Sequence, residues 1–404
     1  MAGEWRETTL GEFVSLQRGH DLTDAERRLG TVPVIGAAGQ NGFHNRALAK
    51  GPGIVVGRSG ASFGQVHYCD KDYWPHNTGL YVTDFRGNYP RFAFYFLKAL
   101  DFSRYNSGSA QPSLNRNFIY PIEVQVPPPD EQRAIAHILG TLDDKIELNR
   151  RMNETLEEMA RALFRSWFVD FDPVRAKAEG RDPALPRPLA HLFPDRLVDS
   201  ELGEIPEGWE EGSFGTFISQ RSERVGARQV AVLSAVSSGK LTRSDDHFTK
   251  RVYSKETDRY LVVERWDFAY NPSRINIGSI GMLEEEVLGG VSPVYVVARP
   301  TPAYRWFLEF SIRRANTKAW INTLASGSVR QSLSYTDFAS IPCVVPPEAV
   351  AQEFNRRWSI WREAIRFSEA QMRTLADLRD SLLPALISGG LRLKDVEKVI
   401  GRAV

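Results

Sequence analysis

Residues 127–132 read Pro-Pro-Pro-Asp-Glu-Gln, and they open a run of helix-forming residues that continues to Phe168. Prolines are tolerated at a helix start because the first amides of a helix have no intrahelical partner. At 1.5 Å per residue, a helix from Asp130 to Phe168 is roughly 60 Å long. Its apolar residues recur at steps of three and four, as in a coiled-coil seam: Ile135, Ile138, Leu142, Met152, Leu156, Met159 and Leu163. Such a helix needs a partner on which to bury its seam.

The partner helix is predicted in the same chain, because the pattern recurs 219 residues further on. This shift carries Pro127-Pro128 onto Pro346-Pro347, and Ser113-Leu114 onto Ser332-Leu333. It also carries apolar positions onto apolar positions: Ile135 onto Phe354, Leu142 onto Trp361, Ile146 onto Ile365, Leu156 onto Leu375, Met159 onto Leu378 and Leu163 onto Leu382. A constant offset over about sixty residues indicates a tandem duplication in which a globular module precedes each long helix.

The seam of each helix is interrupted near its middle, at Lys145 and Asn149 in the first helix and at Ser368 and Gln371 in the second. These polar centres meet only if the helices run antiparallel about a pseudo-twofold axis. Buried polar residues can fix such a register. The alternative arrangement is that each helix folds back on its own module.

The segments before the two helices share a mixed pattern of strands and one helix. In the first segment, apolar runs alternate with glycine-rich turns. This predicts strands at Val32–Ile35, Ile54–Val56, Leu80–Val82 and Ile119–Val126, and a helix at Arg91–Leu100. The second segment repeats the plan. We therefore predict an α+β fold, with two pseudo-symmetric globular modules joined by two long antiparallel, coiled-coil helices.

Prolines and glycines suggest the boundaries of these parts. We expect a first module at 1–126, a long helix at 127–169, a proline-rich connector at 170–208, a second module at 209–345, and a second helix with a tail at 346–404. The connector prolines are expected to stop helices and stiffen loops. Gly389-Gly390 is a helix stop, and Leu391–Val404 has the pattern of a short amphipathic helix.

The composition is that of an ordinary globular protein, with 42% hydrophobic and 25% charged residues in 404. We expect a cytoplasmic protein, because no apolar run approaches a membrane span and the first residues lack a signal-peptide core. Cys69 and Cys343 are far apart, which suits a reducing compartment. A net charge of +1 argues against a simple stand-alone DNA-binding protein, although it permits local basic patches.

Catalytic motifs are missing from the sequence. It holds neither a GxxxxGK[ST] phosphate loop nor a His-Glu-x-x-His metal helix. The glycine-rich stretch Gly57–Gly64 departs from the GxGxxG spacing and is interpreted as a turn. Asn271-Pro272-Ser273-Arg274 lacks the second proline and the aromatic residue of the amino-methyltransferase signature. We predict no catalytic residue, no metal site and no cofactor, which points to a recognition protein.

The order of module, proline-bounded helix, connector, module and helix resembles the specificity (S) subunit of type I restriction–modification systems. Three motifs carry the resemblance: Gly108-Ser109-Ala110-Gln111 before the first helix, the segment from Phe164 to Val174, and Leu202-Gly203-Glu204-Ile205-Pro206-Glu207-Gly208-Trp209 before the second module. The second helix departs from the pattern, because Pro346-Pro347-Glu348-Ala349 replaces the fuller proline-rich start.

The resemblance implies a non-catalytic DNA-recognition subunit. Each module would be a target recognition domain that reads one half of a bipartite site in double-stranded DNA. The helices would set the gap between the halves and dock two methyltransferase (M) subunits, which carry S-adenosylmethionine. Restriction (R) subunits would complete the full complex, and no membrane partner is implied.

The residues expected to bind DNA lie in polar loops, because arginine, asparagine, glutamine and serine side chains read base edges. They are His44, Asn45, Arg46, Arg58, Ser59, Asn77, Gln111, Asn115, Arg116, Arg274, Asn276, Arg330, Gln331 and Tyr335. Arg58 and Arg274 are favoured because they lie in matching turns of the two repeats, although a turn-stabilising role explains both equally well. The competing hypothesis for the whole chain is a protein–protein adaptor whose helices bridge partners without touching DNA.

Overall fold

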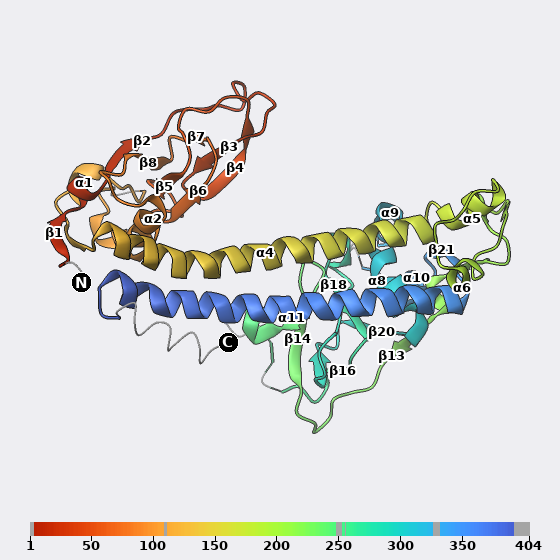
Figure 1. The fold of residues 1–404 in the computed structure, drawn as a ribbon. Helices are drawn as coiled ribbons and strands as arrows, with labels where there is room; N and C mark the ends of the chain where they lie inside the picture. Colours follow the sequence, from red (N-terminus) through yellow and green to blue (C-terminus); the bar gives the residue numbers. More distant parts are fainter. Residues whose placement is uncertain (1–3, 109–110, 248–252, 255, 326–331, 392–404) are drawn as a thin grey trace. The chain divides into compact units, whose positions relative to one another are not determined.

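The computed structural model describes residues 4–108, 111–247, 253–254, 256–325 and 332–391. The chain forms two compact units: Met1–Arg151 with Ser368–Val404, and Met152–Phe367. Two long helices, α4 (Pro129–Phe168) and α11 (Glu348–Ile387), pack together and contribute to both units (Figure 1). Both long helices were predicted at nearly these bounds. The tail helix predicted at 391–404 lies almost entirely outside the described residues.

The first unit holds the first module. Its strands and helices are β1 (Arg6–Thr9), α1 (Leu10–Phe13), β2 (Ser15–Arg18), β3 (Val32–Gly36), β4 (Gly39–His44), β5 (Gly53–Gly57), β6 (Val66–Cys69), β7 (Trp74–Pro75), β8 (Gly79–Asp84), α2 (Pro90–Ala99), the 3₁₀ helix η1 (Phe102–Tyr105), α3 (Arg116–Ile119) and β9 (Glu123–Val126). The predicted strands and helix are confirmed, except that the predicted last strand is divided between α3 and β9.

The second unit holds the second module and the connector. Its elements are α5 (Asp172–Ala178), α6 (Arg187–Ala190), β10 (Leu197–Val198), β11 (Ile205–Pro206), β12 (Glu210–Ser213), η2 (Phe214–Thr216), β13 (Ile218–Arg221), β14 (Ala231–Ala235), β15 (Leu241–Arg243), α7 (Ser244–His247), β16 (Leu261–Val263), β17 (Phe268–Tyr270), η3 (Ile275–Ile277), β18 (Ile280–Met282), β19 (Gly289–Val291), β20 (Val296–Pro300), η4 (Pro302–Tyr304), α8 (Arg305–Arg313), α9 (Ala315–Leu324), α10 (Tyr335–Ala339) and β21 (Pro342–Val345).

The strand order confirms that the module is duplicated. The antiparallel sheet β2-β8-β5-β6 of the first module recurs as β13-β20-β17-β18 in the second. The parallel pair β3–β7 recurs as β14–β19, and the antiparallel pair β1–β9 as β12–β21. Even the register is kept, since Val56 pairs with Val66 and Tyr270 pairs with Ile280, each ten residues further on.

Packing of α4 against α11 is seen separately in each unit, and the contacts of the first unit show that the helices are antiparallel. In the first unit, Asn149 Nδ2 donates to Gln371 Oε1 at 2.8 Å, and Arg379 contacts Asp143 at 2.6 Å. Residue numbers therefore increase along α4 in the direction in which they decrease along α11. In the second unit, the Phe164 ring lies 5.5 Å from that of Phe354. These contacts confirm that the polar centres of the two helices meet, at Asn149 and Gln371. They exclude the alternative arrangement, in which each helix folds back only on its own module.

Each unit has its own hydrophobic core. In the first unit, Phe13 and Tyr95 of the module are fully buried with Leu139 of α4 and Leu386 of α11. The Tyr95 hydroxyl donates to Asp143 at 2.6 Å, and burial followed by this hydrogen bond raises the pKa of Tyr95. The module therefore rests on both long helices within one unit.

The predicted seam is only partly right in the second half of α4, where Leu156 and Leu163 pack against the core of the second unit but Met152 and Met159 do not. Met152 and Met159 are 44% and 47% exposed, whereas Asn153 and Ala160 are buried. Lys145 is also exposed. An ideal straight helix drifts by about 20° per heptad from a strict seven-residue repeat, so a seam extrapolated from the first turns rotates away from the interface.

The connector is more structured than predicted. Prolines begin its helices rather than stop them, because Pro173 and Pro188 occupy the first turns of α5 and α6. Phe193 lies 5.3 Å from Trp167 of α4 and packs in the core of the second unit with Trp209. The segment is thus part of the second unit and not only a link.

Candidate nucleic-acid interface

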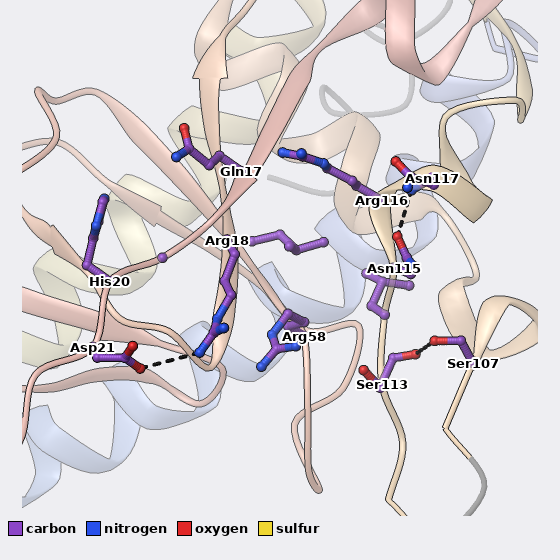
Figure 2. Close-up of a pocket in the computed structure, with 13 residues that line it drawn as sticks. Gln17, Arg18, His20, Asp21, Arg58, Ser107, Ser113, Asn115, Arg116 and Asn117 are labelled. Atoms are coloured by element: carbon purple, nitrogen blue, oxygen red, sulfur yellow. Dashed lines mark hydrogen bonds and ion pairs between the residues drawn. The ribbon is translucent and has the colours of Figure 1, made fainter.

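A cavity of about 660 Å³ opens in the first module, where β2 and β5 end and α3 begins. Polar side chains from these three elements line it (Figure 2). Three of them are the arginines Arg18, Arg58 and Arg116, and the one carboxylate among the lining residues is Asp21. The cavity therefore carries a local positive charge in a chain whose net charge is only +1.

Backbone and side-chain contacts fix Arg58 at the end of β5. Its amide donates to the Thr78 carbonyl at 2.8 Å, and its carbonyl accepts from the Leu114 amide at 2.7 Å. Its Nε donates to the carbonyl of Asn77 at 3.2 Å. The two Nη atoms contact no acceptor among the residues that the structure describes. The guanidinium is therefore held through its Nε, and its two Nη atoms are available to bind a ligand.

Arg18 is held more loosely, at the end of β2. Its Nη2 lies 3.4 Å from Asp21 Oδ1, and the two side chains are 55% and 71% exposed. Exposed pairs of this kind contribute about 0–1 kcal/mol, so Arg18 can exchange its partner for a ligand at small cost. The Asn77 side-chain amide donates to the same carboxylate. Asn77, which is predicted to contact DNA, thus binds both Arg58 and Asp21.

The start of α3 places two further predicted residues in the cavity. Asn115 is the N-cap, and its Oδ1 accepts from the Asn117 amide at 3.0 Å. Arg116 donates to the Leu16 carbonyl at 2.9 Å. In the second module, Tyr335 follows the cap of α10 and donates in the same way to the Ile218 carbonyl, at 3.2 Å. We interpret Arg116 and Tyr335 as residues that position the loops, because Arg116 Nη1 and the Tyr335 hydroxyl each donate to a backbone carbonyl.

The other predicted residues of the first module do not line this cavity. His44 is 6% exposed, accepts from the Arg28 amide and packs 5.0 Å from the Trp74 ring, so its polar atoms serve the module's own core. Asn45 and Arg46 are exposed after β4. Ser59 lines a second cavity of about 220 Å³, and Gln111 is exposed.

Arg58 and Arg274 lie in matching turns of the two repeats, but they occupy different positions in these turns. The amide of Leu114 donates to Arg58, and its counterpart Leu333 donates to Pro272 at 3.1 Å. Pro272 is therefore the residue that corresponds to Arg58, and Arg274 lies two residues further along the same loop. Arg274 and Asn276 are exposed at η3. Arg330 and Gln331 lie outside the described residues.

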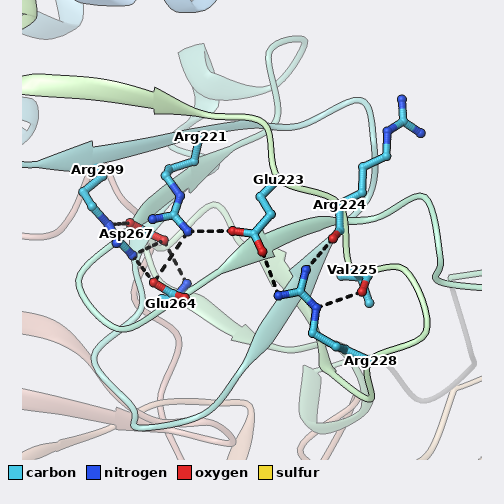
Figure 3. A network of polar contacts seen from close by, with 8 residues as sticks. All are labelled: Arg221, Glu223, Arg224, Val225, Arg228, Glu264, Asp267 and Arg299. Carbon is cyan, nitrogen blue, oxygen red and sulfur yellow. Dashed lines mark hydrogen bonds and ion pairs between the residues drawn. The ribbon is translucent and has the colours of Figure 1, made fainter.

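Arg221 ends β13 as Arg18 ends β2, but its surroundings are acidic (Figure 3). It lies 3.1 Å from Glu223 and 3.6 Å from Glu264. Arg299 joins this network through Asp267, whose side chain is fully buried, and through Glu264. The hydrogen bond from Arg299 lowers the pKa of Glu264, which keeps the carboxylate charged. The strand-end arginine is thus neutralised in the second module.

Several residues of the cavity were missed from the sequence: Gln17, Arg18, Asp21, Ser107, Ser113 and Asn117. A signal was present for four of them. The dipeptide Gln-Arg occurs at 17–18 and again at 220–221, at the ends of corresponding strands. Ser107 and Ser113 recur as serines at the offset of 219 residues, whereas Asp21 and Asn117 carry no comparable repeat.

Within the described part of the chain, no three histidine, cysteine, aspartate or glutamate side chains cluster as a metal site would require. A search of the same residues finds no helix with the length and apolarity needed to cross a membrane.

Comparisons with known proteins agree on one family. Residues 2–158 match the family model of the type I restriction modification DNA specificity domain. The chain is 25% identical over 320 residues to the type I restriction enzyme MjaIX specificity subunit of Methanocaldococcus jannaschii, covering 76% of this chain and 70% of that protein. It is 22% identical over 329 residues to the HindI specificity subunit of Haemophilus influenzae, covering 69% and 71%.

The fold has a counterpart among solved structures. The crystal structure of the type I restriction–modification S subunit from M. genitalium matches with a TM-score of 0.62 and 16% identity, covering 95% of this chain and 96% of that one. The duplicated module, the paired helices and these matches converge. Over most of its length, the chain is similar to DNA specificity subunits of type I restriction–modification systems.

Proposed function

We propose that each module binds one half of a bipartite site in double-stranded DNA, and that α4 and α11 set the gap between the halves. The observation that carries this proposal is the cationic cavity in a module whose fold occurs twice. As a specificity subunit, the chain is the non-catalytic component of its enzyme. The domain limits proposed for this function are 1–126 and 209–345 for the target recognition domains. The spacer helices would then lie at 127–169 and 346–404, and the connector at 170–208.

A first experiment tests DNA binding. The chain is purified with its methyltransferase subunit, and the target is found by sequencing the methylated adenines of a host that carries both genes. We expect affinity for this target to fall linearly on a logarithmic scale of salt concentration, with a slope of about −0.9 per neutralised phosphate. Scrambling either half-site should reduce binding. A protein–protein adaptor would show neither the salt dependence nor the sequence preference.

The long helices also offer a docking surface for methyltransferase subunits. In the second unit, Met152 and Met159 of α4 and Ile360 and Phe367 of α11 are exposed, Phe367 by 72%. In the first unit, Leu148 of α4 is 59% exposed. Exposed apolar residues that gather on otherwise polar helices mark protein interaction sites. We propose that two methyltransferase subunits bind here, that restriction subunits join them, and that the complex works in the cytoplasm.

Phe367→Ala is expected to weaken association with the methyltransferase subunit by about 30-fold, the effect of losing an aromatic anchor worth about 2 kcal/mol. Titration calorimetry of the full chain with the isolated subunit measures this. The control is Arg366→Ala, which is also exposed but lies about 100° further round the helix. Equal affinities for the wild type and Phe367→Ala would place the docking surface elsewhere.

A further inference from the structure

We propose that Arg58 reads a guanine in the half-site bound by the first module, and that the second module has no counterpart of this contact. The inference rests on the proposed function, since it assigns a base to one of the two half-sites. Two observations support this inference: the Asn77 carbonyl fixes the guanidinium of Arg58 through Nε, and Pro272 occupies the position of Arg58 in the second module.

The guanidinium of Arg58 is oriented for a two-pronged contact. Its Nε is occupied by the carbonyl of Asn77, and its two Nη atoms point from a fixed loop into the cavity (Figure 2). Two parallel donors match the O6 and N7 acceptors that guanine presents in the major groove. Among the described residues, no carboxylate forms an ion pair with Arg58, and the contacts of Asp21 are with Arg18 and Asn77.

Other polar residues of the cavity are less suited to this base. The side-chain oxygen Oδ1 of Asn115 caps α3, so the side-chain amide of Asn115 cannot supply the paired donor and acceptor that adenine requires. Arg116 Nη1 donates to the Leu16 carbonyl, so this guanidinium does not present both of its Nη groups to a base. Arg18, with its weak and exposed ion pair, is suited to a phosphate. Arg58 is therefore the base-reading arginine of the cavity.

The second module cannot repeat the contact. Pro272 occupies the position of Arg58 and carries neither a side-chain donor nor a backbone amide hydrogen. Arg221, the counterpart of Arg18, is paired with Glu223 and Glu264. The same fold thus presents an arginine at this position in one module and a proline in the other, so the two half-sites should differ in chemistry.

Modified DNA tests the contact without altering the protein. Each guanine of the methylated target is replaced in turn by 7-deazaguanine, which lacks N7, or by inosine, which keeps both O6 and N7. For the wild-type complex, we expect 7-deazaguanine at one position to weaken binding by about 5- to 150-fold and inosine there to have little effect. In Arg58→Ala, the same 7-deazaguanine should no longer matter.

Matched variants separate base reading from charge. Arg58→Lys keeps the charge but loses the two-pronged geometry, so it should lose the preference for guanine at that position. Arg86→Lys is the control, because Arg86 lies on the turn after β8 and outside the cavity. A uniform loss on all sequences with a shallower salt slope would make Arg58 a phosphate contact and overturn the proposal. So would full tolerance of 7-deazaguanine by a wild-type complex that binds specifically. If the wild type shows no sequence preference, the proposed function itself fails.

Discussion

Inserting four residues into both long helices is expected to lengthen the recognised gap and to leave both half-sites unchanged. One insertion is placed between Arg151 and Met152 in α4, and the other between Phe367 and Ser368 in α11. These are the borders of the two compact units, so every contact within each unit is kept. The first insertion also falls in the polar middle of α4, where Asn149 is buried.

The size of the effect follows from helix geometry. Four residues add about 6 Å to each helix, which corresponds to about two base pairs of DNA at 3.4 Å each. Sequencing the methylated adenines of a host that expresses the variant measures the gap directly. The control is a four-residue insertion in the exposed loop at Gly180, which should leave the gap as it was. An unchanged gap in the doubly inserted variant, with both half-sites retained, would contradict a role of the helices as spacers.

Phe354→Ala is expected to lower the free energy of unfolding by about 3–5 kcal/mol, the cost of removing a large buried aromatic side chain. Phe354 is fully buried on α11. Its ring lies 5.4 Å from Phe168 of α4 and 5.3 Å from Phe310 of α8. It therefore joins the two long helices to the second module within one unit.

Denaturant unfolding followed by circular dichroism measures this loss. Phe367→Ala is the matched control, because it removes the same side chain from the same helix at a position that is 72% exposed. Surface substitutions of this kind change stability by about 0.5 kcal/mol or less. Equal stability of the two variants would show that the aromatic cluster does not hold the helix pair together.

The candidate site was only partly visible in the sequence. Arg58, Asn115 and Arg116 were predicted and do line one cavity. His44 was predicted from its polar neighbours, yet it is buried against Trp74, because a histidine can satisfy its nitrogen within a core as well as on a surface. Arg18 was missed because its signal in the sequence is a single dipeptide, Gln-Arg, which recurs at 220–221 but has no periodic pattern around it.

By itself, the sequence determined the duplication and the two long helices, because these depend on repeated residues and on periodic apolar positions. It favoured their antiparallel pairing, which the contacts between the helices then decided. Only the tertiary structure decided which side chains remain available. Arg58 and Pro272 correspond because each accepts an equivalent backbone hydrogen bond, Arg58 from Leu114 and Pro272 from Leu333. The offset between Arg58 and Pro272 in the sequence differs from the offset between the two long helices. Because the loops of the two modules differ in length, such matches cannot be found by a constant offset in the sequence. The equivalent strand pairing in the two sheets identifies them.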